Sequence, residues 1–444
     1  MKTFRIVTLG CKVNQAESDT LAARLSGSGW RPAEPSEQAD LCVVNTCTVT
    51  QKAAMQSRQA VRQAIHAHPR ACVTVTGCYA ETDPAALAKI EGVDYIVDQC
   101  GKAGLERIIA ACGTEGCAHP VLVSGPAPEA RTPGEPGDPV GPVRGRTRPF
   151  VKIQDGCDAF CAYCIVPYAR GRSRSIAPRA ITESVRHLSA AGFHEVVLTG
   201  IHIGRYGQDL DPPASLLALL RELEAATERV RLRLSSLEPL EVSPDLVARI
   251  AGSRRFCRHL HIPLQSGDAD VLQRMGRPYR PGEFAAAVEL VHRSMPDAAI
   301  GADVLVGFPG ESDQAFRNTC ELIETLPLSY LHVFPFSARP GTAAFDFPDR
   351  VPHPEVKTRC RHLRQLGHAK RNAFHSRFVG REVEVLTESR RDPKTGLLKG
   401  VSDNYLPVLF HGGNEHMGQM RRVAIDSLVT AGLQGVLVGD PPQF

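Results

Sequence analysis

The residues most suited to chemistry are three cysteines, Cys157, Cys161 and Cys164, which form a C-x₃-C-x₂-C run. Three thiolates hold three irons of a cubic 4Fe–4S cluster and leave the fourth iron open to bind a small molecule. A structural zinc ion is the alternative, but it requires four closed nitrogen or sulfur ligands. No histidine or fourth cysteine lies close to the run. The run therefore predicts an iron–sulfur cluster with one open site.

A second set of three cysteines, Cys11, Cys47 and Cys78, is spread over the first part of the chain. Each of them closely follows a short apolar segment that predicts a β-strand, and helical patterns lie between these segments. Such alternation predicts a parallel sheet, in which the carboxyl ends of neighbouring strands lie side by side. The three thiols are therefore expected to converge in space, as a second three-cysteine cluster requires.

The other eight of the 14 cysteines show no convergent placement. A cysteine inside a strand behaves as a small buried hydrophobe, and we predict a structural role for all eight. The C-x₄-C spacing of two of them, near a linker, is too faint to predict a metal site. They are Cys42, Cys72, Cys100, Cys112, Cys117, Cys257, Cys320 and Cys360.

Composition places the chain among globular proteins, with 43% apolar and 23% charged residues. Its 444 residues predict two or three domains, and a net charge of +4 permits a nucleic-acid partner without proving one. The sequence opens without a signal-peptide pattern, and no apolar run reaches the ~20 residues of a membrane span. We therefore expect a cytoplasmic protein without membrane association, where clustered cysteines bind metal more often than they pair.

Strand and helix patterns divide the chain into four parts. Residues 1–123 predict a parallel α/β sheet domain, and residues 124–148, rich in Pro, Gly and Arg, predict a linker. Residues 149–376 predict six β/α units, a partial (β/α)₆ barrel, which ends in a basic helix over 353–378. Residues 377–444 predict a small all-β barrel. The barrel strands are expected at 150–153, 195–198, 231–234, 259–262, 300–305 and 330–333.

Both cysteine sets, in this order, resemble those of the radical S-adenosylmethionine (SAM) methylthiotransferases. The resemblance covers essentially the whole chain, and the closing all-β segment is similar to the TRAM domain of that family. The closest resemblance is to the branch that modifies threonylcarbamoyladenosine in tRNA, the MtaB type, although His202 stands where that branch is expected to have Asn. The segments that carry it are 9–15, 44–47, 76–78, 153–157, 165–175, 199–207 and 400–405.

The resemblance implies two 4Fe–4S clusters and SAM as cofactors. One cluster, on Cys157, Cys161 and Cys164, is expected to cleave SAM to a 5′-deoxyadenosyl radical. The other, on the second cysteine set, is expected to hold a sulfur species that another SAM methylates. A radical is needed because no side-chain base can remove a proton from an unactivated aromatic C–H bond at neutral pH. The implied product carries a methylthio group on C2 of N6-threonylcarbamoyladenosine at tRNA position 37.

The loops after the predicted barrel strands supply candidates for SAM binding, because (β/α) barrels carry their chemistry there. Serine, glycine and aspartate are ordinary turn residues as well, so the placement of these residues on consecutive loops is the argument for them. Arg277 is a weaker candidate for the SAM carboxylate. The predicted cofactor-binding residues are Tyr163, Thr199, Gly200, Ser235, Glu238, Gln265 and Asp303.

The expected macromolecular partner is the tRNA anticodon loop, since sequence-specific RNA recognition favours unstacked loops. The basic helix and the small β barrel are predicted to supply phosphate contacts. Arg170, Arg172 and Arg174, just past the cysteine run, are further candidates for RNA contact. An electron donor such as a flavodoxin or ferredoxin system is implied, and a monomer is expected.

Two other functions stay open at this stage. Sister branches of the family methylthiolate isopentenyladenosine in tRNA or an aspartate of a ribosomal protein, and only the branch resemblance separates these substrates. A non-catalytic iron–sulfur RNA-binding protein or redox sensor would need one cluster and no SAM pocket. The polar loops at Glu238, Gln265 and Asp303 argue against that interpretation.

Overall fold

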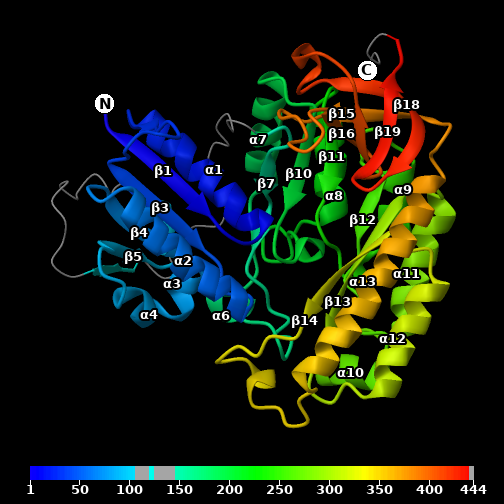
Figure 1. Cartoon of the computed structure of the whole chain (residues 1–444), viewed down its shortest axis with the longest axis horizontal. Coiled ribbons are helices and arrows are strands. Elements are labelled where there is room, and N and C mark those ends of the chain that lie inside the picture. Colours follow the sequence, from blue (N-terminus) through cyan, green and yellow to red (C-terminus); the bar gives the residue numbers. More distant parts are fainter. Residues whose placement is uncertain (106–119, 125–145, 440–444) are drawn as a thin grey trace.

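A six-stranded parallel sheet forms the first part of the computed structural model, which describes residues 1–105, 120–124 and 146–439 (Figure 1). The strand order is β2-β1-β3-β4-β5-β6, and the central strand β3 is buried along its whole length. The strands are β1 (Thr3–Thr8), β2 (Arg31–Pro32), β3 (Leu41–Thr46), β4 (Cys72–Gly77), β5 (Tyr95–Val97) and β6 (Val121–Val123). The helices are α1 (Lys12–Gly27), α2 (Gln51–Ala67), α3 (Cys78–Thr82) and α4 (Pro84–Ala88).

The predicted parallel sheet is thus confirmed, and its differences from the prediction have local causes. Helix α1 begins at Lys12, and its first turns bury the apolar side chains of Val13 and Ala16 together with the polar side chain of Asn14. A short helix, α3, precedes α4, and the chain breaks between the two at Asp83, which caps α4. The edge strands β2 and β6 are too short for the alternation of side chains to reveal them.

Six parallel strands form the centre of the molecule, and all six predicted strands are confirmed. They pair as β11-β10-β7 and β12-β13-β14, and an isolated parallel bridge between Leu232 and Phe256 joins β11 to the next segment. The strands are β7 (Phe150–Lys152), β10 (Glu195–Thr199), β11 (Arg231–Leu234), β12 (His259–His261), β13 (Ala299–Val306) and β14 (Tyr330–Pro335). The covering helices are α7 (Pro178–Ala190), α8 (Leu216–Ala226), α9 (Pro244–Ala251), α11 (Pro281–Ser294), α12 (Asp313–Thr325) and α13 (His353–Ser376).

A closed five-stranded barrel forms the last part of the described chain, as the sequence predicts. Its order is β15-β16-β17-β19-β18, and its interior holds apolar side chains such as Val385, Phe410 and Val423. The strands are β15 (Glu382–Thr387), β16 (Leu398–Ser402), β17 (Pro407–Phe410), β18 (Met420–Val429) and β19 (Gly432–Leu437).

The small barrel (red in Figure 1) is fastened to the central strands by a buried ionic cluster. Glu195 accepts hydrogen bonds from Arg231 and Arg233 at 2.6 and 2.7 Å. The same guanidinium groups donate to backbone carbonyls of the small barrel, at Val401 and Ser402. Burial alone would raise the pKa of Glu195, but the two arginines lower it to about 2, so the carboxylate stays charged. This contact lies at the amino end of β11, away from the cysteine loop.

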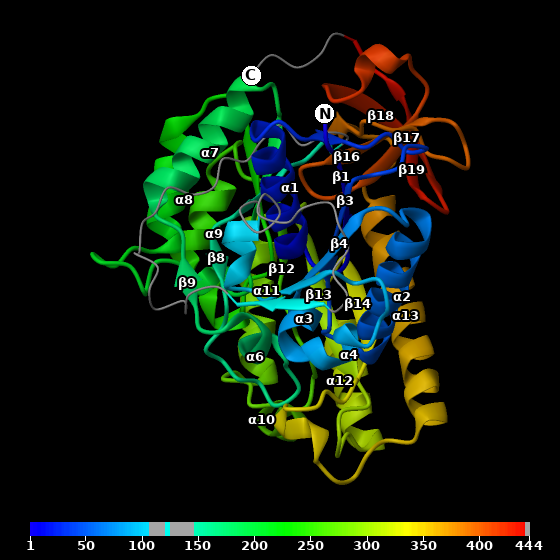
Figure 2. The same cartoon turned by 90° about the vertical axis from the view of Figure 1, so that its left-hand side faces the viewer.

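A second buried ionic cluster fastens the first sheet to the central strands through α1. Glu17 of α1 forms ion pairs with Arg170, Lys152 and Lys102 at 2.9, 3.0 and 2.6 Å. Arg170 also pairs with Asp155 at 2.8 Å. Burial alone would raise the pKa of Glu17, but Arg170 and the two lysines lower it well below 4.5. In both views α1 lies between the blue sheet and the central strands (Figures 1 and 2).

Several basic residues expected to meet RNA have structural roles instead. The prediction that Arg170 contacts RNA is wrong, because its side chain is 1% exposed and is held by ion pairs. On the basic helix α13, Arg359 is buried against Glu311, and Lys370 donates to the carbonyls of Glu324 and Leu326. None of the helices in the described ranges is both long and apolar enough to cross a membrane.

Candidate functional site

The loop that carries Cys157, Cys161 and Cys164 lies between β8 (Gln154–Asp155) and α6 (Val166–Arg170). Gly156 has φ +71°, and a Cβ atom there would lie 1.9 Å from the carbonyl oxygen of Arg172, so only glycine fits. The amide of Cys157 donates to Gly171 at 3.0 Å, and the amide of Cys164 donates to Cys161 at 2.9 Å. Local backbone contacts therefore fold this loop around its three thiols.

Gln154 ties the cysteine loop to the loop that follows β10. Its side chain is fully buried, and its amide nitrogen donates to the carbonyl of Gly156 at 2.8 Å. Its amide oxygen accepts from the backbone of Ile201 and His202 at 3.0 and 2.8 Å. A Cβ atom at Gly200 would lie 3.0 Å from that oxygen, which explains the glycine. Thr199 and Gly200 are thus held next to the cysteine loop, as predicted.

Arg277 and Glu238 form an ion pair beside the thiols. Arg277 donates to the sulfur of Cys161 at 3.2 Å and pairs with the Glu238 carboxylate. Although burial disfavours both charged forms, Tyr163 and Glu238 raise the pKa of Arg277, whereas burial raises the pKa of Glu238. Burial raises the pKa of the Tyr163 phenol, and the positive charge of Arg277 partly opposes this rise. Two predicted residues and the weaker candidate Arg277 therefore lie together at the first cysteine set.

His202 lies on the other side of the loop, and the sequence marked it only as a departure from the family pattern. Its Nδ1 is 3.6 Å from the sulfur of Cys157, and its Nε2 is 2.6 Å from the Glu241 carboxylate. Burial alone would lower its pKa, but the bonds with Cys157 and Glu241 raise it to about 10. The position of Glu241, three residues after the predicted site residue Glu238, was the sequence signal that could have suggested a carboxylate partner for His202.

The first cysteine set fits a cluster that binds SAM through an open iron. Burial raises the pKa of the Cys164 thiol to about 12, so metal binding must displace its proton. The hydroxyl of Ser235 is buried and has no hydrogen-bond partner among the described residues, as expected of a group that awaits a ligand. Gln265 adopts a left-handed φ of +61° and bonds to its neighbours through its backbone. In the described part of the chain, neither Ser235 nor Gln265 forms a hydrogen bond to the cysteine loop.

The second cysteine set stands at three neighbouring strand ends, as the topology prediction required. Cys11 precedes α1, Cys47 follows β3, and Cys78 begins α3, while β1, β3 and β4 are adjacent in the sheet. A Cβ atom at Gly10 would lie 2.7 Å from the sulfur of Cys47, so the Cys11 loop passes directly over that thiol. Gly10 has φ +91°, a conformation that favours glycine.

Asn14 holds the ends of β1 and β3 together. Its side-chain nitrogen donates to the carbonyls of Leu9 and Thr46 at 2.8 and 2.9 Å, and its own carbonyl accepts from Asn45 at 2.9 Å. Asn14 is fully buried, so these bonds are shielded from water. They fix the distance between the Cys11 and Cys47 loops.

The second set also fits an inorganic group. Cys47 lines a hollow of about 470 Å³, together with Gly10 and Val49. Burial raises the pKa of Cys47 to about 11, and the neighbouring thiols Cys78 and Cys11 contribute to this rise. The side-chain oxygens of Asn45 and Thr76 are buried without partners in the described part of the chain.

One buried network joins the two cysteine sets. Arg170, at the end of α6, bonds to Asn14 and Glu17 of α1 and to Asp155 beside the Cys157 loop. Burial raises the pKa of the Cys78 thiol, and the positive charge of Arg170 lowers it. Helices α3 and α6, one from each cysteine region, lie against each other in both views (Figures 1 and 2). The two sets therefore face a common region of the molecule.

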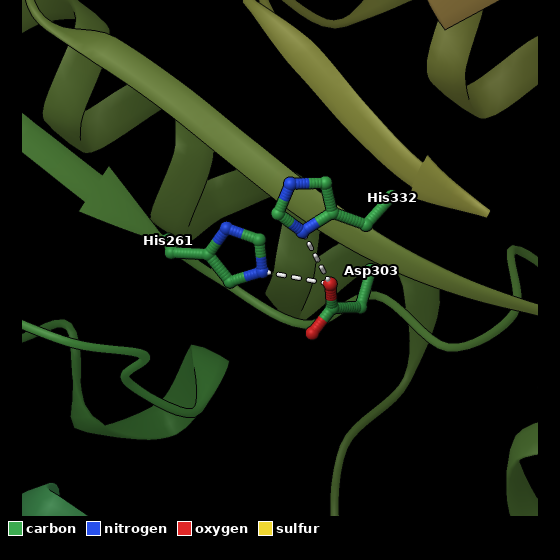
Figure 3. Close-up of side chains that lie close together, drawn as sticks. All are labelled: His261, Asp303 and His332. Carbon is green, nitrogen blue, oxygen red and sulfur yellow. Dashed lines mark hydrogen bonds and ion pairs between the residues drawn. The ribbon is translucent and has the colours of Figure 1, made fainter. Parts of the chain in front are cut away.

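Asp303 lies in a cluster of ring nitrogens that the sequence did not reveal. His261 Nε2 and His332 Nδ1 lie 2.9 and 3.2 Å from the same carboxylate oxygen (Figure 3). Burial alone would raise the pKa of Asp303, but the two histidines lower it. Two histidines and one carboxylate are a composition that metal sites use. The register of β13 and β14, which sets Asp303 opposite His332, brings them together.

Lys12, directly after Cys11, faces the central strands from the start of α1. Its side chain is exposed to solvent. Burial and the charge of Arg233 lower the pKa of Lys12, whereas Asp303 acts in the opposite direction. Both of these neighbours belong to central strands, so the start of α1 lies near those strands.

Two family descriptions match the chain. Residues 3–98 match the family described as "Uncharacterized protein family UPF0004", and residues 151–323 match the radical SAM superfamily. The first range holds Cys11, Cys47 and Cys78, and the second holds the C-x₃-C-x₂-C run.

Named relatives extend over nearly the whole chain. The threonylcarbamoyladenosine tRNA methylthiotransferase MtaB of Bacillus subtilis is 35% identical over 96% of this chain and 94% of its own length. That of Aquifex aeolicus is 36% identical over 94% of this chain and 98% of its own. A tRNA-2-methylthio-N(6)-dimethylallyladenosine synthase from Pelotomaculum thermopropionicum is 31% identical over 98% of both chains.

A solved structure supports the fold alone. The radical SAM methyltransferase TsrM from Kitasatospora setae, with cobalamin and a [4Fe-4S] cluster bound, aligns with a TM-score of 0.55 at 17% identity. The alignment covers 78% of this chain and 77% of TsrM. The near full-length relatives, with the match to the radical SAM superfamily, show that the chain belongs to the family of radical-SAM methylthiotransferases.

Proposed function

We propose that the protein transfers a methylthio group to C2 of N6-threonylcarbamoyladenosine at position 37 of tRNA. Near full-length similarity to proteins named for this activity supports the substrate. The observation that carries the reaction type is the pair of cysteine sets, joined by Arg170 in one buried network. A single set would suffice for a generic radical enzyme, whereas sulfur insertion needs a second place to hold sulfur.

We propose two 4Fe–4S clusters and SAM as cofactors, with Cys157, Cys161 and Cys164 holding one cluster and the second cysteine set holding the other. When bound, a reduced cluster and SAM supply a carbon radical able to break an unactivated C–H bond. Arg277 would hold the SAM carboxylate in exchange for its present bonds to Glu238 and Cys161, because a guanidinium binds carboxylates in a planar, bidentate way. The remaining members of the proposed SAM site are Tyr163, Thr199, Gly200, Ser235, Glu238 and Gln265.

Asp303 is the weakest member of the proposed SAM site. Both histidines of Figure 3 already bind one of its carboxylate oxygens, which leaves it less able to bind a ligand. In its place the buried, unpartnered Ser235 hydroxyl is a better donor for a ribose or carboxylate oxygen.

The tRNA partner would lie where exposed aromatic and basic side chains meet near the cysteine loop. Phe160 and Tyr168 are 51% and 50% exposed and pack edge to face at 5.6 Å, which suits the stacking of unpaired bases. Arg172, four residues after Tyr168 in the sequence, is exposed and makes no side-chain ion pair in the described ranges, in contrast to Arg170. The proposed domains are 1–123, 149–376 and the RNA-binding barrel 377–444, joined by the linker 124–148. A flavodoxin- or ferredoxin-type electron donor and a monomeric state complete the proposal.

Anaerobic reconstitution with iron and sulfide, followed by reaction with SAM, a reductant and tRNA, tests this function. The expected product is 2-methylthio-N6-threonylcarbamoyladenosine, detected by mass spectrometry of the nucleosides, together with 5′-deoxyadenosine. A tRNA that carries dimethylallyladenosine serves as the matched substrate control. Methylthiolation of that nucleoside in place of threonylcarbamoyladenosine would contradict the proposed substrate, and a lack of deoxyadenosine would contradict the radical mechanism.

A further inference from the structure

Two histidines and an aspartate bring ligand atoms together on three neighbouring central strands (Figure 3). His261 lies on β12, Asp303 on β13 and His332 on β14, and Asp303 is the register partner of His332. His261 Nε2 and His332 Nδ1 lie 2.9 and 3.2 Å from the same oxygen of Asp303. The cluster belongs to neither cysteine set, and the proposed SAM site uses neither of its histidines.

The spacing of these three atoms suits a single metal ion. An ion about 2.0–2.1 Å from each ligand atom separates neighbouring ligand atoms by about 2.9–3.4 Å, in octahedral or tetrahedral geometry. Both distances to the Asp303 oxygen fall in this range, and the two ring nitrogens lie within 4.8 Å of each other. His332 can close the remaining gap by a small movement, because its side chain is 52% exposed on the edge strand β14.

Tyr330 holds the ring of His261 from the side opposite the ligand atoms. Its hydroxyl lies 3.1 Å from His261 Nδ1 and 2.7 Å from His259 Nε2. Gly301 stands between Tyr330 and His261 in the strand register, and a Cβ atom there would lie 2.1 Å from the Tyr330 ring. The glycine therefore lets the phenol reach the histidines. A supporting bond on the second ring nitrogen is the usual companion of a metal-bound histidine.

The Tyr330 hydroxyl can serve His261 in either tautomer, because a hydroxyl both donates and accepts. When His261 donates from Nε2 to Asp303, its Nδ1 accepts a hydrogen bond from the hydroxyl. When Nε2 is bare, Nδ1 carries the proton and donates to the hydroxyl oxygen instead. His261 can therefore turn a lone pair toward a metal ion and still keep its hydrogen bond to Tyr330.

We propose that His261, Asp303 and His332 together bind one divalent transition metal ion, of the class that includes zinc. Two imidazoles and a carboxylate favour such ions over magnesium and calcium, which prefer oxygen ligands. Among the described residues, the other carboxylate oxygen of Asp303 accepts no hydrogen bond, and this side chain is 25% exposed. Water or another oxygen ligand can therefore complete the coordination. Binding at this site requires neither SAM nor tRNA.

Zinc binding by the reconstituted, untagged enzyme tests the proposal, because the clusters then occupy the thiols that would otherwise bind zinc. Equilibrium dialysis followed by elemental analysis should show one zinc ion per chain in the wild type. His332→Ala and Asp303→Asn should abolish this binding, and Tyr330→Phe should weaken it by about 10- to 100-fold, the usual cost of losing a supporting bond. His187→Ala, at an exposed histidine of α7, should match the wild type.

Three results would overturn the proposal. The first is a wild-type enzyme that binds no zinc, which needs no variant and so does not depend on whether a variant folds. The second is zinc binding that both His332→Ala and Asp303→Asn retain in full. The third uses cobalt in place of zinc, because thiolate ligands give cobalt an intense near-ultraviolet charge-transfer band that nitrogen and oxygen ligands do not give. Such a band, unchanged in His332→Ala, would place the bound metal on cysteines.

Discussion

The two cysteine sets reach a similar arrangement in opposite ways. The first set lies within eight residues of one loop, and local contacts made by Gly156 and Gln154 shape it. The second set gathers its thiols from three strand ends separated by 36 and 31 residues, and it depends on the order of β1, β3 and β4. The first is therefore a property of local sequence, and the second is a property of the fold. Changes in sheet packing should affect the second set and leave the first intact.

The surroundings of the sets differ as well. Charged groups approach the first, with Arg277 at Cys161 and His202 at Cys157. The side chains that hydrogen-bond at the second set are neutral, since Gln99 lies 3.6 Å from the sulfur of Cys78 and Ser57 bonds to the backbone of Cys47. A charged surrounding suits a zwitterionic ligand such as SAM, whereas a neutral one suits a bound sulfur species. This contrast matches the division of roles that we propose.

Replacing one cysteine in each set gives the largest expected effect. Cys161→Ala should abolish 5′-deoxyadenosine formation, because the cluster that starts the reaction loses a ligand. Cys47→Ala should retain deoxyadenosine formation but yield no methylthiolated nucleoside. Each variant should bind about half the iron of the wild type, since two cubane clusters are expected. Iron analysis and liquid chromatography of the products measure this.

Cys257→Ala is the matched control, because Cys257 is buried in the central part but belongs to neither set. It should keep full iron and product. Deoxyadenosine formation by Cys161→Ala would contradict the division of roles.

Gly156→Ala should remove the first cluster alone. A methyl group there would lie 1.9 Å from the Arg172 carbonyl, and φ +71° disfavours any side chain, so the loop must shift. We expect the loss of about half of the iron and all of the deoxyadenosine, with the far-ultraviolet circular dichroism unchanged. Gly192→Ala, at a helix end with φ +87° but open space, is the control for strain without collision. Full cluster content in Gly156→Ala would show that the loop is less constrained than its contacts indicate.

Glu17→Gln should weaken the contact that holds the two sets together. Removing one partner of a buried ion pair typically costs about 3–5 kcal/mol. The folded-state pKa of Glu17 lies well below its ordinary 4.5, so this stabilisation is present above pH 4.5 and is lost as the pH falls through the folded-state value. Urea unfolding at pH 7 and at about pH 2, well below the ordinary pKa of a glutamate, measures it. The difference between wild type and Glu17→Gln should be largest at pH 7, and an equal difference at both pH values would contradict this assignment.

The sequence predicted each set by a different route, and the same contrast explains what it missed. Spacing alone revealed Cys157, Cys161 and Cys164, while the second set required strand order as well. Contacts such as His261 and His332 on Asp303 depend on strand register, which side-chain patterns do not encode. Arg170 was predicted to contact RNA because the sequence of three nearby arginines does not indicate which of their side chains is buried. Cys112 and Cys117 lie outside the described residues, so their predicted structural role stays a prediction.

The smallest expected effects come from two buried hydroxyl groups that lack hydrogen-bond partners in the described chain. Ser235 follows β11 and belongs to the proposed SAM site, and Thr76 lies two residues before Cys78 of the second cysteine set. Ser235 and Thr76 form no side-chain hydrogen bond in the described chain, so Ser235→Ala and Thr76→Val should leave the stability of the cluster-free protein unchanged or raise it slightly. If Ser235 binds SAM, its variant should weaken SAM binding by about 3- to 10-fold, the usual range for one hydrogen bond. Thr76→Val should leave SAM binding unchanged and speed the loss of the second cluster. Calorimetry with SAM and iron release to a chelator separate the two outcomes, and equal effects of both variants on SAM affinity would show that the two sets share one pocket.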